Sequence, residues 1–251
     1  MAELRFSSVS VRYGPQTVVR DVSIAVASGG VLGLVGESGS GKSSLARAAV
    51  GLASLAQGRI SVDGAALATG RGRSRAVQMI FQDPFASLDP RMSIGATIAE
   101  ALPASGRRPR SGRAAEVARL LDLVGLDPAR AGSRPGQLSG GQRQRVAIAR
   151  ALAARPAFII ADEITSALDV SVQGAILNLI KNLRTELGLG LLFISHNISV
   201  VRYVSDTIAV MWEGALVETG PAERVLASPQ HAYTRELLAT ARDSALTMEG
   251  S

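Results

Sequence analysis

Residues 31–52 read VLGLVGESGSGKSSLARAAVGL. The first five residues have the apolar composition of a short buried strand, and Ser43–Leu52 has that of a helix. Between them, Gly36–Ser43 fits the pattern G-x-x-x-x-G-K-[ST] in the strand–loop–helix setting that this pattern requires. The glycines let backbone N–H groups surround phosphates, and the helix N-terminus adds a partial positive charge. The stretch predicts a nucleotide site in which Lys42 reaches the β- and γ-phosphates and Ser43 holds Mg²⁺.

A second chemical signal lies at the end of another apolar run. Phe158–Glu163 reads FIIADE, a buried strand that ends in two carboxylates. Nucleotide-bound magnesium needs an acidic residue at a strand end beside the phosphate loop, and Asp162 suits that role. Glu163 is one residue further on, where it can orient or deprotonate an attacking water. An isolated Asp-Glu pair is also common at solvated strand ends. The pair therefore indicates a magnesium site only because the same chain carries the phosphate-loop motif.

The remaining pattern predicts an α/β fold. Leu4–Val11 and Val18–Ala27 alternate apolar and polar residues around a Gly-Pro turn, as in an antiparallel pair. Arg59–Val62 followed by Asp-Gly predicts a further hairpin. Strands alternate with helical segments along the rest of the chain, for example Ile94–Leu102 and Arg113–Val124, which favours a mostly parallel sheet covered on both faces.

Composition excludes several classes of function. The 251 residues are 47% hydrophobic and 19% charged, which is typical of a folded globular protein. With no cysteine and two histidines, the chain has no disulfide, thiolate metal site or histidine-built metal site. No run approaches the roughly 18 apolar residues of a membrane-spanning helix, and the N-terminus lacks the pattern of a signal peptide. We therefore expect a cytoplasmic chain.

The chain is basic, with a net charge of +6 and a pI of about 10.6. Lys42 and Lys181 are its only lysines, so nearly all of this charge is arginine. A solvated arginine-rich surface explains the balance, and a basic face for nucleic acid or anionic lipid is the alternative. No aromatic residues interleave with the arginine runs Arg71–Arg75 and Arg107–Arg113, which argues against a groove for single strands. Both runs are expected to be exposed loops.

The phosphate loop and the acidic strand end indicate a phosphate-loop NTPase without saying which kind. The discriminating segment is Leu138–Gln142, LSGGQ, in which Ser139 can cap a helix beginning near Gly141. Because this pentapeptide lies between the other two motifs, the chain resembles the ABC ATPase family. The resemblance implies a single domain with a RecA-like, mostly parallel sheet core and an antiparallel β subdomain. The core is expected to comprise residues 1–84 and 156–251, with an inserted α-helical subdomain at 85–155.

The resemblance also implies roles for individual residues. Tyr13 is similar to the aromatic that stacks on adenine, and His196 to the histidine that grips the γ-phosphate. Gln82 resembles the glutamine that contacts Mg²⁺ and the lytic water, and Ser166–Asp169 resembles the loop at the dimer interface. The expected catalytic residues are Glu163, His196 and Gln82. The expected metal-binding residues are Ser43, Gln82 and Asp162. The expected nucleotide-binding residues are Tyr13, Gly36, Ser38, Gly39, Ser40, Gly41, Lys42, Ser43, Ser44, Ser139, Gly140, Gly141, Gln142 and Asp162.

As in the family, two ATPase subunits are expected to close head to tail on ATP, with the signature motif of one facing the phosphate loop of the other. The second subunit is either a copy of this chain or a related ATPase. The turn-rich segment Asp83–Pro90 is expected to expose Phe85 and Leu88 to transmembrane permease subunits. The chain would then lie on the cytoplasmic face of the inner membrane.

A narrower resemblance rests on QDPFASLDPRMSIGATIAEAL at 82–102 and SPQHAYTRELL at 228–238. These segments look like those of the ATPases that serve oligopeptide, dipeptide and nickel importers, which work with an extracytoplasmic binding protein. The sequence departs from relatives at Ile164, where proline is common, and at Asn197, where aspartate is frequent. Many members carry a cysteine-rich C-terminal extension, so this cysteine-free chain resembles the shorter partner of such a pair.

Two rival interpretations remain. The first is a non-transport ABC ATPase that acts on nucleic acid or ribosomes, which the basic pI supports. Against this interpretation, the sequence contains no second cassette, no coiled-coil insertion and no zinc-binding cysteines. We therefore expect no nucleic-acid partner. The second rival is a sensor module that binds ATP but turns it over poorly, and the presence of Glu163 and His196 argues against it.

Overall fold

The computed structural model describes residues 2–67, 75–83, 87–103 and 110–249. The chain divides into two compact units, one formed by residues 1–74 and 188–251 and the other by residues 75–187. They are called unit 1 and unit 2. The division suggested by the sequence, with helical residues 85–155 inserted into a core, stays a prediction.

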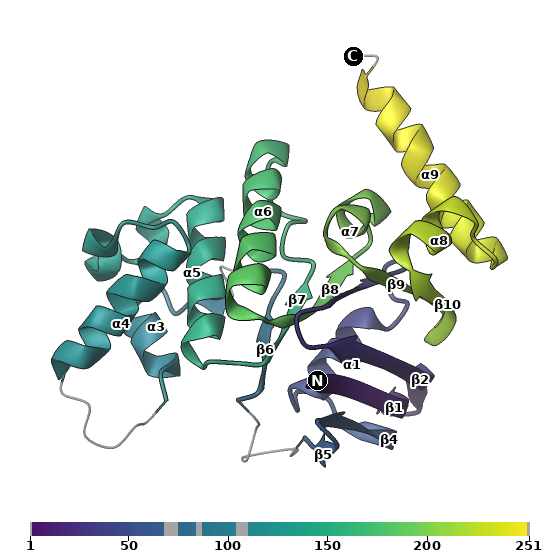
Figure 1. Cartoon of the computed structure of the whole chain (residues 1–251), viewed down its shortest axis with the longest axis horizontal. Helices are drawn as coiled ribbons and strands as arrows, with labels where there is room; N and C mark the ends of the chain where they lie inside the picture. Colours follow the sequence, from purple (N-terminus) through teal and green to yellow (C-terminus); the bar gives the residue numbers. More distant parts are fainter. Residues whose placement is uncertain (1, 68–74, 84–86, 104–109, 250–251) are drawn as a thin grey trace. The chain divides into compact units, whose positions relative to one another are not determined.

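Unit 1 contains the antiparallel sheet that the alternating pattern predicted. Its strands pair in the order β2-β1-β4-β5 (Figure 1). Their bounds are β1 Glu3–Tyr13, β2 Gln16–Ala27, β4 Leu55–Val62 and β5 Ala65–Ala66. Asp63 and Gly64 both have positive φ, 51° and 78°, as a tight hairpin turn requires. The predicted hairpin after Val62 is confirmed.

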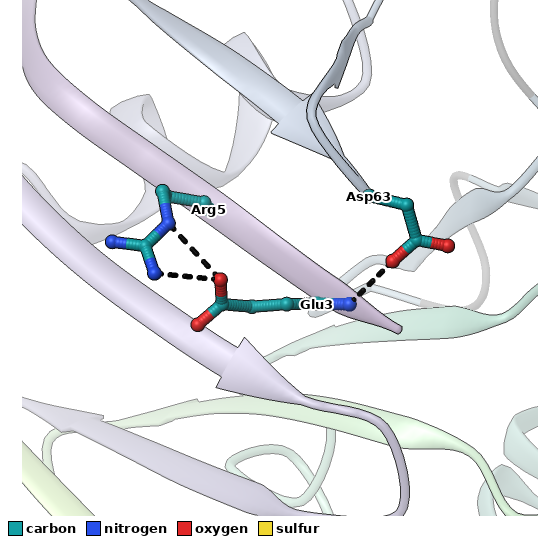
Figure 2. A network of polar contacts seen from close by, with 3 residues as sticks. All are labelled: Glu3, Arg5 and Asp63. Carbon is teal, nitrogen blue, oxygen red and sulfur yellow. Dashed lines mark hydrogen bonds and ion pairs between the residues drawn. The ribbon is translucent and has the colours of Figure 1, made fainter. Parts of the chain in front are cut away.

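Polar contacts fasten the start of the chain to this hairpin (Figure 2). The backbone N–H of Glu3 donates to Oδ1 of Asp63 at 2.7 Å, and the N–H of Asp63 donates to the Glu3 carbonyl at 3.0 Å. The guanidinium of Arg5 donates twice to Oε2 of Glu3, at 3.0 and 2.7 Å. The turn residue Asp63 therefore fixes the register of β1 against β4.

Unit 1 also holds four strands in the order β10-β9-β3-β8. Strand β3 is parallel to both of its neighbours, and β10 is antiparallel to β9. The bounds are β3 Val31–Val35, β8 Gly190–Ser195, β9 Thr207–Trp212 and β10 Ala215–Pro221, with helices α1 Lys42–Ala49, α7 Ile198–Val204, α8 Ala222–Ala227 and α9 Ala232–Glu249. All residues of β3 and β8 are buried, which is typical of parallel strands covered on both faces. A Cβ at Gly33 would overlap Val201 and Ser205, so glycine allows α7 to pack closely on β3.

Unit 2 combines two parallel strands with a helical part (Figure 1). The strands are β6 Val77–Ile80 and β7 Phe158–Asp162, and the helices are α3 Ile94–Ala101, α4 Arg110–Leu123, α5 Gly140–Ala153 and α6 Val170–Leu187. Short 3-10 turns at Pro128–Gly132 and Pro135–Gln137 connect α4 to α5. Helices α3, α4 and α5 pack against one another. The helices predicted at Ile94–Leu102 and Arg113–Val124 are confirmed.

Two expectations about exposed segments need correction. Leu88 was expected at an exposed docking surface, but it is buried, with only 3% of the residue accessible, because an apolar side chain is more stable out of water. Phe85 lies outside the described residues, as do residues 71–74 and 107–109 of the arginine-rich segments. The last part of Arg107–Arg113 is helical rather than a loop, since α4 begins at Arg110. Among the described helices, none is both long and apolar enough to cross a bilayer.

Candidate functional site

The phosphate loop of unit 1 follows β3 directly and leads into α1, as the sequence predicted. Gly36 has φ 154°, and a Cβ there would run into the Met211 carbonyl and Ser40 Oγ. Gly41 has φ 99°, and its Cβ would come within 2.5 Å of the Val18 carbonyl. Both positions therefore require glycine, for the backbone angle and for the space. The result is a tight loop whose backbone lies close to its neighbours in unit 1.

Lys42, the single cationic residue of the loop Gly36–Ser43, is buried, with 4% of the residue accessible. Its Nζ donates to the carbonyls of Gly36 at 2.8 Å and Glu37 at 2.7 Å, and to Ser40 Oγ at 3.2 Å. A buried ammonium is tolerated only where such acceptors surround it. The Lys42 ammonium is therefore surrounded by residues of its own loop. The sequence predicted that this group binds phosphate.

The other loop residues follow the pattern expected of a phosphate cradle. Ser38 and Gly39 are exposed, whereas Ser40 is buried. The Ser40 carbonyl accepts from the N–H of Gly214 at 3.1 Å, which ties the loop to the turn after β9. Ser43 and Ser44 are half-buried in the first turn of α1. Exposed backbone at a helix N-terminus, with a serine in the first turn, fits phosphate and magnesium.

Two further predicted residues lie in unit 1. Tyr13 is the last residue of β1 and is 46% accessible, so its ring is exposed enough to stack on a planar ring system. His196 follows β8 and is exposed. Asn197, the departure from the common aspartate, caps α7 by accepting from the N–H groups of Ser199 at 2.9 Å and Val200 at 3.4 Å. The amide oxygen therefore supplies the same capping function that an aspartate would.

The carboxylate pair lies in unit 2 at the end of β7. Asp162 is buried, with 4% accessible. Glu163 is half-buried and has φ 49°, a left-handed conformation that costs a non-glycine residue about 1–2 kcal/mol. Ile164, where proline is common, is 1% accessible and anchors the turn in the core. Burial of the next residue, Ile164, thus helps to hold the Glu163 backbone in its strained conformation.

A hydrogen-bond chain links Gln82 to this pair. The Gln82 side-chain amide donates to Ser166 Oγ at 3.3 Å, and Ser166 Oγ donates to the Glu163 carbonyl at 2.9 Å. The Ser166 N–H donates to the same carbonyl at 3.1 Å. Sequence reasoning placed Ser166 in an interface loop and missed this bridging position. No sequence signal identified it, since Gln82 and Ser166 are 84 residues apart.

The signature segment forms the N-terminus of α5 in unit 2. Ser139 Oγ accepts from the N–H of Gln142 at 3.3 Å, and Gln142 Oε1 accepts from the N–H of Ser139 at 3.0 Å. This reciprocal capping box confirms the predicted cap, with the helix beginning at Gly140. A Cβ at Gly141 would come within 2.5 Å of Val172, so glycine is needed for α6 to approach. Ser139 is exposed at a helix end that favours anions.

No group of three or more His, Cys, Asp or Glu side chains is arranged to hold a metal ion, within the part of the chain that the structure describes. The predicted magnesium set contains one carboxylate, one hydroxyl and one amide. Magnesium in nucleotide sites takes one or two carboxylates together with substrate phosphates and water. The predicted donors therefore fit a metal that arrives with the nucleotide.

Comparison with known proteins identifies the family. The family profile described as ABC transporter matches residues 19–166, which include the phosphate loop, the signature segment and the carboxylate pair. The chain belongs to the ABC transporter family of ATP-binding proteins. The resemblance stated from the motifs is thereby confirmed, and the chain is an ABC ATPase.

Relatives extend over most of the chain. A peptide import ATP-binding protein of Brucella abortus strain 2308 is 47% identical over 226 residues, which cover 88% of this chain and 68% of that protein. The glutathione import ATP-binding protein GsiA of Escherichia coli K12 is 50% identical over 226 residues. The match covers 88% of this ABC ATPase but 36% of GsiA, so the chain spans about a third of that relative.

Solved structures confirm the fold. The cbiO1 protein of Clostridium perfringens, described as part of the ABC transporter complex cbiONQ, matches with a TM-score of 0.81 at 25% identity and 98% coverage of both chains. The ATP-binding cassette MJ0796, bound to ADP and Pi as a dimer, matches with a TM-score of 0.74 at 27% identity. That match covers 87% of this ABC ATPase and 98% of the other chain. The predicted ABC nucleotide-binding fold is confirmed.

Proposed function

We propose that this ABC ATPase binds and hydrolyses MgATP to power import of a peptide-like substrate through partner permeases. The observation that carries the proposal is the complete set of motif residues, in family order, on a chain whose phosphate loop already holds Lys42 among backbone carbonyls. The names of the relatives, peptide import and glutathione import, support a peptide-like substrate over a nickel-type one.

Phosphate binding falls to the loop and to α1. Backbone N–H groups of Ser38–Ser44 and the helix N-terminus bind the phosphate oxygens. Lys42 exchanges its contact with Ser40 Oγ, which at 3.2 Å is longer than those with the Gly36 and Glu37 carbonyls, for a phosphate oxygen. Tyr13 offers its exposed ring to adenine. The tight glycine positions keep this surface formed before the nucleotide arrives.

Ser43, Asp162 and Gln82 are proposed to hold Mg²⁺ together with the phosphates. The ion supplies positive charge that offsets the negative charge developing on the transferred phosphoryl group. Glu163 orients the attacking water and accepts its proton, and His196 contacts the γ-phosphate. The bridge through Ser166 keeps the Gln82 amide and the Glu163 backbone in a fixed relation. Positioning and charge stabilisation account for most of the acceleration in such reactions.

A second ATPase subunit completes the proposal. Ser139, Gly140, Gly141 and Gln142 present a capped helix end with bare backbone, which suits the γ-phosphate of a nucleotide bound to the other subunit. ATP then joins the two subunits, and hydrolysis removes the group that joins them. The dimeric ADP-bound cassette MJ0796 supports this arrangement. The second subunit is either another copy of this chain or a related ATPase.

We further propose transmembrane permeases and an extracytoplasmic substrate-binding protein as partners, with the chain at the cytoplasmic face of the inner membrane. The membership of cbiO1 in a transporter complex supports the permease partner. The absence of a suitable spanning helix among the described residues is compatible with an ATPase that is held at the membrane by other subunits.

The test is ATP hydrolysis by the purified chain and by Glu163→Gln, with the dimeric state followed in MgATP. We expect the wild type to hydrolyse ATP and the variant to lose about 100-fold or more in kcat, because the base is gone. The variant should also accumulate as an ATP-bound dimer. Glu186→Gln, which makes the same change at an exposed position of α6, serves as the matched control and should behave as the wild type.

Equal rates for the wild type and Glu163→Gln would overturn the assignment of Glu163. If the wild type is inactive alone, the measurement is repeated with co-purified permeases and a second ATPase subunit. Substrate class is tested on the reconstituted complex, where a peptide-loaded binding protein should stimulate hydrolysis. Stimulation by a nickel-loaded protein and not by peptide would overturn the proposed substrate.

A further inference from the structure

The peptide group between Gly36 and Glu37 is held from both sides. Its carbonyl, on Gly36, accepts from Lys42 Nζ at 2.8 Å. Its N–H, on Glu37, donates to the hydroxyl of Tyr233 at 2.8 Å. Tyr233 lies 196 residues further along the chain, in the first turn of α9. A peptide plane bonded at both ends cannot rotate without breaking one of these bonds.

Tyr233 is suited to this contact because it is buried and neutral. It is 6% accessible. Burial raises the pKa of its phenol, and the Glu37 N–H opposes that effect only in part. A neutral hydroxyl both accepts and donates, so it receives the Glu37 N–H while it keeps its own proton.

Strand β9 supports the same arrangement from its end. Its last residue, Trp212, stacks on Tyr233 with ring centroids 5.8 Å apart and planes tilted by 27°. The preceding residue, Met211, presents its carbonyl to Gly36, where even a Cβ would collide. Two adjacent residues of β9 therefore contact the phosphate loop and the tyrosine that holds it.

The segment before α9 is anchored independently. The Glu218 carboxylate accepts from the N–H groups of Gln230 at 2.8 Å and His231 at 3.0 Å. Burial opposes the charged form of Glu218, but its polar neighbours, among them these two N–H groups, lower its pKa overall. His231 Nδ1 in turn accepts from the N–H of Tyr233 at 3.2 Å. The position of the tyrosine is thus set by strand β10 as well as by Trp212.

We propose that Tyr233 is a positioning residue for the phosphate loop. By holding the Glu37 N–H, it keeps the Gly36 carbonyl turned toward Lys42, so that the ammonium stays aimed into the loop when a phosphate replaces Ser40 as its partner. The inference rests on the proposed binding of MgATP. In this proposal the start of α9 helps to bind the nucleotide, although α9 lies outside the family profile, which ends at residue 166.

Trp212 provides the spectroscopic test, since it is the single tryptophan of the chain and stacks on Tyr233. We expect MgATP to change its emission in the wild type. Tyr233→Phe keeps the ring and removes only the hydroxyl. We expect it to need about three- to tenfold more MgATP for half the emission change and for half-maximal hydrolysis, the effect of one lost hydrogen bond. The change should fall on KM rather than on kcat, because Tyr233 does not touch the reacting atoms.

Tyr203→Phe is the matched control, since it removes a hydroxyl from a 49% exposed tyrosine of α7. It should give the wild-type KM. Thermal unfolding of all three proteins separates misfolding from weakened binding, and a variant with wild-type Tm and raised KM supports the inference. Wild-type KM in Tyr233→Phe would overturn the inference and leave the proposed function intact. Failure of the wild type to bind radiolabelled MgATP would overturn the proposed function and, with it, the inference.

Discussion

The side-chain amide of Gln82 donates a hydrogen bond of 3.3 Å to the hydroxyl of Ser166. The same hydroxyl donates at 2.9 Å to the carbonyl of Glu163, whose backbone φ of 49° is unusual for a residue other than glycine. Gln82, which is proposed to hold Mg²⁺, is therefore connected through one serine to the backbone of the residue proposed to activate water. Ser166 is thus the one residue that these two hydrogen bonds share.

Ser166→Ala removes this bridge. We expect kcat to fall about three- to tenfold, because one net hydrogen bond is worth about 0.5–1.5 kcal/mol and the strained Glu163 backbone loses an anchor. KM for MgATP should change less than about twofold. Steady-state hydrolysis measures both constants. Ser166→Thr keeps the hydroxyl and should retain most of the activity, whereas equal loss in both variants would contradict the role of the bridge.

Ser139 combines a structural role and a proposed functional role that two substitutions separate. Ser139→Ala removes the α5 cap, and we expect a loss of about 1 kcal/mol in the free energy of unfolding. Ser139→Asp keeps a capping oxygen and should retain stability. Its negative charge would repel the γ-phosphate, so ATP-driven dimerisation on the Glu163→Gln background should be lost. Denaturant unfolding and size-exclusion chromatography in MgATP give the two readouts. Normal dimerisation of the Asp variant would argue against a phosphate contact.

Glu116 gives unit 2 a pH-dependent contribution to stability. Its carboxylate accepts from Arg119 at 3.1 and 3.2 Å and lies 3.6 Å from Arg155. The hydrogen bond from Arg119 lowers the pKa of Glu116, and burial opposes this only in part. A carboxyl group with a lowered folded-state pKa stabilises the protein above its unfolded-state pKa and loses this contribution as the pH falls through the folded value.

Glu116→Gln should therefore lower the free energy of unfolding by about 0.5–1 kcal/mol at neutral pH, the range of partly exposed ion pairs. The difference from the wild type should begin to shrink as the pH falls below the ordinary pKa of an unfolded glutamate, about 4.3, and should disappear at the lower pH at which the native carboxylate takes up its proton. Urea unfolding of both proteins at several pH values measures this. A difference that stayed constant down to pH 3 would show that Glu116 acts through packing and not through its charge.

Replacing glycine by alanine is expected to have opposite effects on stability at Gly33 and at Gly174. Gly33→Ala places a methyl group against Val201 and Ser205, and we expect a loss of about 1–3 kcal/mol from overpacking between β3 and α7. Gly174→Ala lies in α6, where nothing is within 4 Å of the added carbon, and should stabilise the protein by about 0.5–1 kcal/mol. Thermal and denaturant unfolding check both. Stabilisation by Gly33→Ala would contradict the close approach of α7.

The sequence alone determined those parts of the protein whose structure is decided over a few neighbouring residues. The phosphate loop Gly36–Ser43 needs glycines at fixed positions because the backbone there takes angles and approaches that other residues cannot. The cap of α5 by Ser139 depends on an N–H three residues away. Turn residues and apolar runs likewise placed the strands and helices, since their preferences are local.

Only the tertiary structure decided which distant residues meet. Leu88 looked exposed because it lies in a turn-rich segment, but its burial depends on what packs over it. The bond from Gln82 to Ser166 and that from Glu37 to Tyr233 join residues 84 and 196 positions apart. Such contacts form when separate strands and helices are packed to within hydrogen-bonding distance, and that packing is set by many side chains at once. The motifs therefore specify the chemistry of each segment, and the packed fold decides which segments act together.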